Sequence, residues 1–179
     1  MMYRSRFVLP GLSLIALSLG LTFAEADPSV VTARRVRLAI VDFVYLDTSG
    51  ELSDQAAAHR RRLQIFMAGL RRDFAADERF LLVTLSCGPA ACNNDTPVSD
   101  LHRAVSYAGA NILVTGGIHK QSTLVQWAKV TAIAIDANRV VLEKLFTFRG
   151  DSDEAWGRAE AFISQDIRNA LATTSVSAH

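Results

Sequence analysis

The sequence predicts one α/β (α+β) domain, a mixed β-sheet with helices packed on it, in the order β-α-β-α-β-β-β-α. Helical patterns separate the first three strand-like segments, and such crossovers predict parallel strands. Two later strand-like segments, 124–135 and 140–148, flank the turn-forming residues 136–139, which predicts an antiparallel hairpin. We expect the domain to extend over residues 36–172, a length that can bury one core.

Three apolar runs predict the first strands. Residues 36–45, 79–85 and 112–119 are short, apolar and bounded by polar residues, as is typical of buried strands. Gly116 and Gly117 lie inside the third run. Two glycines within a strand predict a bulge, or the close approach of another backbone.

Apolar residues at helical spacing predict three helices. The first has five such residues on one face: Leu63, Phe66, Met67, Leu70 and Phe74. The second is expected to begin at Ser99 or Asp100 and to end before Gly109. The last has a buried stripe of five residues: Trp156, Ala159, Ile163, Ile167 and Leu171.

The first helix also has a basic side. Five arginines lie opposite the apolar stripe or on its flanks: Arg60, Arg61, Arg62, Arg71 and Arg72. A solvated polar face is normal for a surface helix. The alternative interpretation is a basic docking surface for an acidic partner.

The N-terminal residues resemble a secretory signal. Arg4 and Arg6 precede an uncharged apolar run, and Ala24 and Ala26 supply the small residues that a signal peptidase requires. We therefore predict a signal peptide over residues 1–26, cleaved after Ala26 or, as the alternative, after Ala24. A retained membrane anchor is the other interpretation, although the run is only marginally long enough to span a bilayer.

The ends and the charge of the mature chain limit its partners. Residues 27–35 are expected to form a flexible leader, and residues 173–179 a disordered tail. The whole chain has a formal net charge of +1, and the predicted signal peptide carries the same net charge, so the mature chain is formally neutral. A neutral chain is not expected to bind nucleic acid, and no stable membrane anchor is expected after cleavage.

Cys87 and Cys92 are the two cysteines of the sequence. In an oxidising periplasm a close pair of cysteines predicts a disulfide that fixes the shape of one loop. Free or redox-active thiols and a metal site are the alternatives. The C-x4-C spacing differs from the C-x-x-C of thiol oxidoreductases, and no histidines at suitable spacing complete a zinc site.

Catalytic motifs are missing from the sequence. It contains no G-x-S-x-G elbow, H-E-x-x-H motif, P-loop or G-x-G-x-x-G motif. None of the four histidines pairs with another at metal-ligand spacing, and His59 borders an apolar stripe, which favours a packed role. We therefore expect no catalytic residues, no metal and no cofactor.

Two polar groups are candidate binding sites for a ligand or partner. The first consists of Asp42, Asp47 and Thr48, at and beyond the end of the first strand, where open α/β sheets often bind ligands. Gly117 and His119, on the third strand, are added to this group. The alternative is that Asp42 only caps neighbouring backbone.

The second polar group precedes and begins the last helix. It contains Arg149, Asp153 and Trp156, together with Asp151 and Glu154. A carboxylate of either group is a candidate ion-pair partner for Arg149. The alternative interpretation is helix capping by the acids, which the helix dipole favours, with Trp156 in the core.

Several sequence blocks resemble a family of uncharacterised exported proteobacterial proteins, domain of unknown function 2380 with the neighbouring 3280. The blocks are V-D-F at 41–43, L-D-T-S at 46–49, G-A-N-I-L-V-T-G-G at 109–117 and F-R-G-D-S-D-E-A-W at 148–156. The strand and helix order, with A-I-V-D-F and G-A-N-I-L-V-T-G, is also similar to the N-terminal domain of TolB and related envelope proteins. That resemblance implies a fold used for protein contacts and assembly, without known catalysis. Because the chain lacks the β-propeller of TolB, a Tol–Pal role is not implied.

These observations predict a non-catalytic, periplasmic accessory module that binds an unidentified envelope protein. A small-ligand sensor domain, with its site near Asp42, Asp47 and His119, is one alternative. A periplasmic hydrolase or redox enzyme is another. The strand at 124–135 would be available for pairing with another chain if it lay at the sheet edge.

Overall fold

A computed structural model of the chain describes residues 35–88 and 91–176. These residues belong to one compact unit, Ala33–His179. The predicted signal peptide, residues 1–26, and positions 27–34 of the predicted leader lie outside the described residues.

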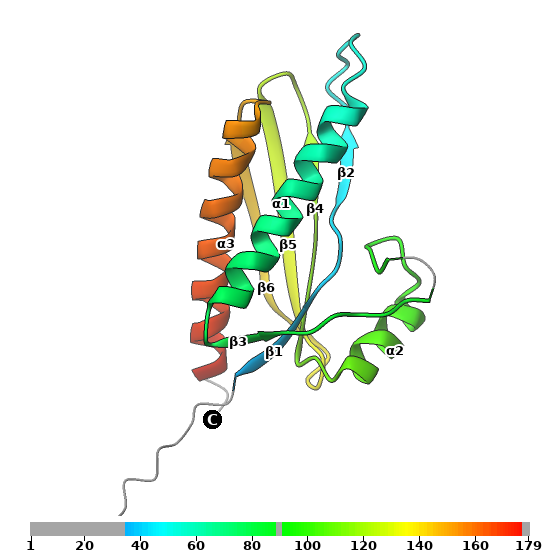
Figure 1. The fold of residues 1–179 in the computed structure, drawn as a ribbon, viewed down its shortest axis with the longest axis vertical. Coiled ribbons are helices and arrows are strands. Elements are labelled where there is room, and N and C mark those ends of the chain that lie inside the picture. The colour runs from blue at the N-terminus through cyan, green and yellow to red at the C-terminus, as the bar shows by residue number, and fades with distance from the viewer. Residues whose placement is uncertain (1–34, 89–90, 177–179) are drawn as a thin grey trace, which may run out of the picture. The chain divides into compact units, whose positions relative to one another are not determined.

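The predicted fold class is confirmed, and the elements follow the predicted order except that the first strand is split in two (Figure 1). They are β1 (Val36–Ile40), β2 (Val44–Asp47), α1 (Ala56–Ala76), β3 (Phe80–Leu82), α2 (Val98–Ala108), β4 (Ile112–Lys120), β5 (Val125–Ala134), β6 (Arg139–Arg149) and α3 (Asp153–Val176).

The strands form one mixed sheet with the order β3-β1-β4-β5-β6, and β2 continues beside β4. β1 is parallel to β3 and β4, whereas β4, β5 and β6 are antiparallel neighbours. The predicted crossovers and hairpin are therefore both present. The strand predicted at 124–135 does not lie at a sheet edge, because β5 is paired with β4 and with β6. It is therefore not available for pairing with another chain; the edges of this order are β3 and β6.

The split of the first strand comes from one extra residue. β1 pairs Ile40 with Val114, and β2 pairs Val44 with Gly117, so four steps along this strand match three along β4. Such an insertion is a β-bulge, which bends the strand locally. Gly116 lies opposite the bulge, where a Cβ atom would come within 2.6 Å of the Phe43 ring. The predicted close approach of another backbone is therefore found, at the Lys129 oxygen, whereas the bulge lies in the neighbouring strand and not in β4 itself.

We expect Gly116→Ala to lower the free energy of unfolding by about 1–3 kcal/mol, the usual effect of overpacking a core. The added Cβ would also lie 2.6 Å from the backbone oxygen of Lys129, which has little freedom to move away. Gly157→Ala is the control, since a Cβ there meets nothing within 4 Å and alanine favours a helix by up to about 1 kcal/mol. Urea unfolding of both variants checks this, and equal stability of Gly116→Ala and wild type would contradict it.

Helices cover the two faces of the sheet unequally. α1 and α3 lie along one face, as Figure 1 shows, and enclose the main core with inward residues such as Leu38, Val114 and Val130. The predicted stripes of both helices lie in this core, with Leu63 only partly buried. α2 packs by Ala104 on the opposite face, in a smaller core that covers only part of that face.

Two predicted boundaries differ from the structure. β3 ends at Leu82 rather than 85, although the Val83 N–H still donates to the carbonyl of Leu38 at 2.8 Å. The predicted tail, 173–179, is helical as far as Val176. In this last part of α3 the Thr173 hydroxyl donates to the carbonyl of Ala170 at 2.8 Å.

The predicted disulfide joins Cys87 and Cys92. The loop that contains it is attached to the strand bulge, since the Asp42 N–H donates to the carbonyl of Cys92 at 3.2 Å. Asp42 and Asn93 form an isolated parallel bridge at the same place. The disulfide therefore shapes a loop that lies against β1 and the bulge.

Candidate functional site

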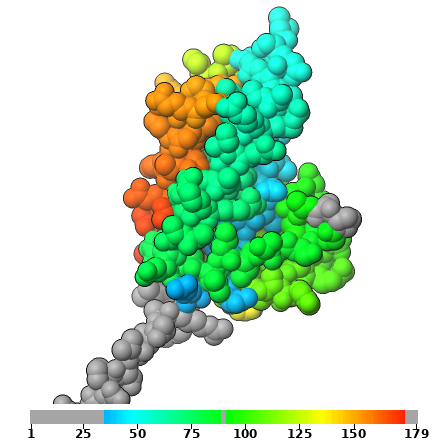
Figure 2. All heavy atoms as spheres, in the orientation of Figure 1, coloured from blue at the N-terminus to red at the C-terminus, as the bar shows by residue number. Residues whose placement is uncertain are grey.

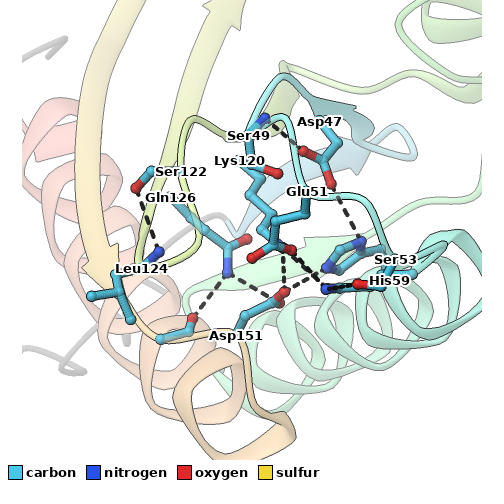
Figure 3. Close-up of polar contacts among 12 residues, drawn as sticks. Asp47, Ser49, Glu51, Ser53, His59, Lys120, Ser122, Leu124, Gln126 and Asp151 are labelled. Atoms are coloured by element: carbon cyan, nitrogen blue, oxygen red, sulfur yellow. Dashed lines mark hydrogen bonds and ion pairs between the residues drawn. The ribbon is translucent and has the colours of Figure 1, made fainter.

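A cluster of charged side chains is enclosed where β2 and β4 end and where α1 and α3 begin (Figure 3). Its centre is Lys120, which is 0% exposed. The Lys120 ammonium donates to Glu51 at 2.5 Å, to Asp151 at 2.7 Å and to the side-chain oxygen of Gln55 at 3.1 Å. These bonds use all three hydrogens of the ammonium. We call Lys120 and its three partners, Glu51, Gln55 and Asp151, the Lys120 cluster.

Asp151 connects the Lys120 cluster to both helices. His59 of α1 donates from Nε2 to Asp151 at 2.8 Å, and Arg62 donates to its other oxygen at 2.9 Å. The indole N–H of Trp156, from α3, reaches the same carboxylate at 3.3 Å. One aspartate thus holds together a strand end and the first turns of two helices.

Local backbone geometry places Asp151. Gly150 has φ 96°, a left-handed conformation that suits glycine and turns the chain from β6 into α3. The Gly150 N–H donates to the carbonyl of Leu124 at 2.9 Å, and its carbonyl accepts from Gln126 at 2.9 Å. The carboxylate that follows lies near the N-terminus of α3, where the helix dipole favours negative charge.

The ion pairs of the Lys120 cluster shift the pKa values of its members. Burial alone would raise the pKa of Asp151, but hydrogen bonds from Lys120 and His59 outweigh it and lower this pKa to about 2. Burial would lower the pKa of Lys120, but the bonds to Asp151 and Glu51 raise it above its ordinary value. Lys120 is therefore a protonated, enclosed ammonium. Such a group is suited to holding the end of β4 to the segments that precede α1 and α3, and not to acting as a base or nucleophile.

The structure brings several predicted site residues together. Asp47 accepts from the Ser49 N–H at 2.9 Å and lies 3.8 Å from Nδ1 of His59. Thr48 is hydrogen-bonded to Nε2 of His119 at 2.7 Å. Nε2 of the same His59 lies 2.8 Å from Asp151, so the two polar groups predicted from the sequence meet through His59 of α1. Asp153 accepts from Arg62 at 2.9 Å.

Other predicted site residues lie apart from the Lys120 cluster. Asp42 pairs with Arg71 at 2.7 Å near the strand bulge, so it does not share a site with Asp47 and His119. Gly117 packs its backbone against Val44. Arg149 is exposed, and among the described residues it forms no ion pair, so the carboxylates pair with Arg62 instead.

Sequence reasoning missed four members of this region: Glu51, Gln55, Lys120 and Gln126. For Lys120 a signal was present, because the inward positions of β4 alternate through Ile112, Val114 and Ile118 to reach it. A lysine on the inward side of a strand indicates a buried charge with a partner.

Neither a metal centre nor a membrane span is found within residues 35–88 and 91–176. In these segments no group of three histidine, cysteine, aspartate or glutamate side chains is arranged to hold a metal ion. None of the helices there combines the length and apolar character needed to cross a membrane.

The fold and the Lys120 cluster define an α/β domain with a mixed sheet, tied together by buried ion pairs at one end. The chain belongs to the family of the model DUF3280, described as a protein of unknown function (DUF2380), which matches residues 36–167. None of the curated proteins matches the sequence.

Solved structures are similar at low identity. The hypothetical protein CT253 from Chlamydia trachomatis has a TM-score of 0.51 and 12% identity, over 80% of this chain and 99% of that one. TolB from Acinetobacter baumannii has a TM-score of 0.47 and 19% identity, over 77% of this chain but only 28% of TolB. The LpoB C-terminal domain from Salmonella enterica has a TM-score of 0.43 and 14% identity, over 66% and 85% of the two chains.

Proposed function

We propose that the chain is a non-catalytic, periplasmic accessory module that binds a protein of the bacterial cell envelope. The N-terminal signal features support export. The bond between Cys87 and Cys92 supports an oxidising compartment and leaves no free thiol for a redox role. The observation that carries the binding role is a part of the sheet that no described helix covers.

We call this surface the open sheet face. It lies on the side of the sheet on which α2 packs, in the part that α2 leaves uncovered, and it includes His119 of β4, Trp127 and Lys129 of β5, and Leu145 and Thr147 of β6. On β5 the buried residues Gln126, Ala128 and Val130 face inward. Successive side chains of a strand alternate between its two faces, so Trp127, which lies between Gln126 and Ala128, points outward. Trp127 lies opposite His119 on β4 and opposite Thr147 on β6. The rings of Trp127 and His119 pack edge to face with centroids 6.2 Å apart.

The composition of the open sheet face fits a protein partner. Leu145 is 60% exposed and lies opposite Lys129, two pairs further along the hairpin and on the same face. A partly buried tryptophan beside an exposed leucine, within a polar rim, is the arrangement that concentrates binding energy in protein interfaces. The strands hold these side chains at fixed positions, so binding would order few of them.

Site-specific photo-crosslinking in cells of the native host tests this proposal. A photoreactive residue at Thr147 or Leu145 is expected to capture one envelope protein, and Trp127→Ala is expected to reduce that capture by about tenfold or more, as for a hot-spot residue. Arg158, exposed on the outer side of α3, is the matched control position. Equal capture from Arg158, or capture that Trp127→Ala leaves unchanged, would contradict a partner on the open sheet face.

A further inference from the structure

α1 and α3 lie side by side on the same face of the sheet, as Figure 2 shows, and residues of both helices line a groove between them. It has a volume of about 370 Å³ and mainly apolar walls, including Ile65, Phe66 and Trp156. Pockets that bind small molecules are typically a few hundred Å³ in volume, apolar, and supplied with a few polar groups that fix orientation. Here Glu160 supplies such a group.

Glu160 is buried without a hydrogen-bond partner among the described residues. It is 7% exposed, and its Oε1 atom accepts no hydrogen bond. The nearest cation is Arg72, whose Nη2 lies 3.9 Å from Oε2, and Arg72 also bonds to Asp73 at 3.1 Å. A buried carboxyl in this state is stabilised strongly by any donor that reaches it.

Two glycines shape the space around this carboxyl. A Cβ on Gly69 would lie 2.6 Å from the carboxyl carbon of Glu160, so glycine at this position makes room for the acid. A Cβ on Gly157 would meet nothing within 4 Å, so the groove is open beside it. The walls can therefore admit a narrow chain that reaches Glu160.

We infer that the groove binds a primary ammonium carried on a short apolar chain, with the ammonium donating to Glu160 and the chain lying against Phe66 and Trp156. An ammonium supplies the hydrogen-bond donors that Glu160 lacks, together with a positive charge closer than that of Arg72. The arginines at the rim are already engaged, since Arg62 bonds to both Asp151 and Asp153. The inference is independent of the proposed protein-binding function, because this groove and the open sheet face lie on opposite sides of the sheet.

Binding should strengthen as Glu160 ionises. Burial and the neighbouring Asp73 raise the pKa of Glu160 to about 7, while Arg72 of α1 and Arg168 of α3 oppose the rise. The groove also holds Arg62 and Asp153, which pair with each other. An alkylammonium remains charged in this range, so its affinity should increase about tenfold from pH 6 to pH 8.

Titration of the purified protein with hexylammonium tests the inference. The fluorescence of Trp156 reports binding in a Trp127→Phe background, which removes the second tryptophan. We expect a saturable change with hexylammonium and none with hexanoate. Glu160→Gln should weaken binding by about tenfold or more at pH 8, whereas Glu154→Gln, an exposed acid on the same helix, should leave it unchanged.

Gly157→Leu is a second variant, which fills the groove without altering Glu160. It should abolish binding while the protein stays folded. Several results would overturn the inference: binding of hexanoate as tight as that of hexylammonium, full affinity in folded Glu160→Gln or Gly157→Leu, or an affinity independent of pH between 6 and 8.

Discussion

Asp151→Ala is expected to lower the free energy of unfolding by about 3–5 kcal/mol at pH 7, the usual effect of removing one partner from a buried ion pair. Lys120 would keep a buried charge with only Glu51 to balance it, and His59 would lose its partner at 2.8 Å. Arg62 and Trp156 would lose hydrogen bonds as well. Chemical denaturation followed by circular dichroism measures the change.

Asp153→Ala is the matched control for this prediction. Its carboxylate also pairs with Arg62, but its side chain is 58% exposed, so solvent screens the pair and the loss should be much smaller than that of Asp151→Ala. Equal losses in free energy of unfolding would contradict this prediction, because the buried Asp151 would then contribute no more to stability than the exposed Asp153.

The effect of Asp151 should also depend on pH. Its pKa is about 2 in the folded protein, below the ordinary value of 3.8. The stabilisation by its ionised form is therefore complete above about pH 4 and is lost as the pH falls toward 2. The difference in stability between wild type and Asp151→Ala should shrink over this window.

Glu160→Gln is expected to stabilise the protein, with an effect that grows with pH to about 2–3 kcal/mol at pH 8. The folded pKa of Glu160 is about 7, raised from 4.5 mainly by burial. An acid whose pKa rises on folding destabilises the fold progressively as the pH increases from its unfolded to its folded value. Glutamine has nearly the same shape and no charge, so it removes this penalty.

Urea unfolding of wild type and Glu160→Gln at pH 4.5, 6 and 8 measures this trend. The two curves should nearly coincide at the lowest pH and separate as the pH increases. Glu154→Gln, which alters an exposed acid, should follow wild type throughout. A constant difference between wild type and Glu160→Gln across these conditions would contradict a buried, ionising carboxyl.

The sequence was sufficient to predict the order of elements because each depends on local periodicity. The apolar spacing of Phe66, Leu70 and Phe74 identified α1, and the hairpin followed from two β-rich segments around a turn. The break between β1 and β2 was missed, because Val41 and Phe43 continue the apolar run through the bulge. Which strand forms an edge depends on long-range pairing, which local patterns do not contain.

The candidate site was predictable in parts but not as a whole. The two polar groups were found because acids and threonines cluster at strand and helix ends. Their meeting depends on His59, which lies near Asp47 and bonds to Asp151, a residue 92 positions away in the sequence. Glu160 was missed because it lies one residue beyond the stripe position Ala159, where sequence alone does not distinguish a buried acid from a solvated one.

The proposed role depends on delivery to the periplasm, and intact mass spectrometry of the protein released by osmotic shock tests this most directly. We predict a chain that begins at Asp27 or, after the alternative cleavage, at Glu25. It should not react with a thiol-alkylating reagent until it is reduced, because Cys87 and Cys92 are bonded. Recovery of the full-length chain from the cytosol, with both cysteines alkylated directly, would contradict the account.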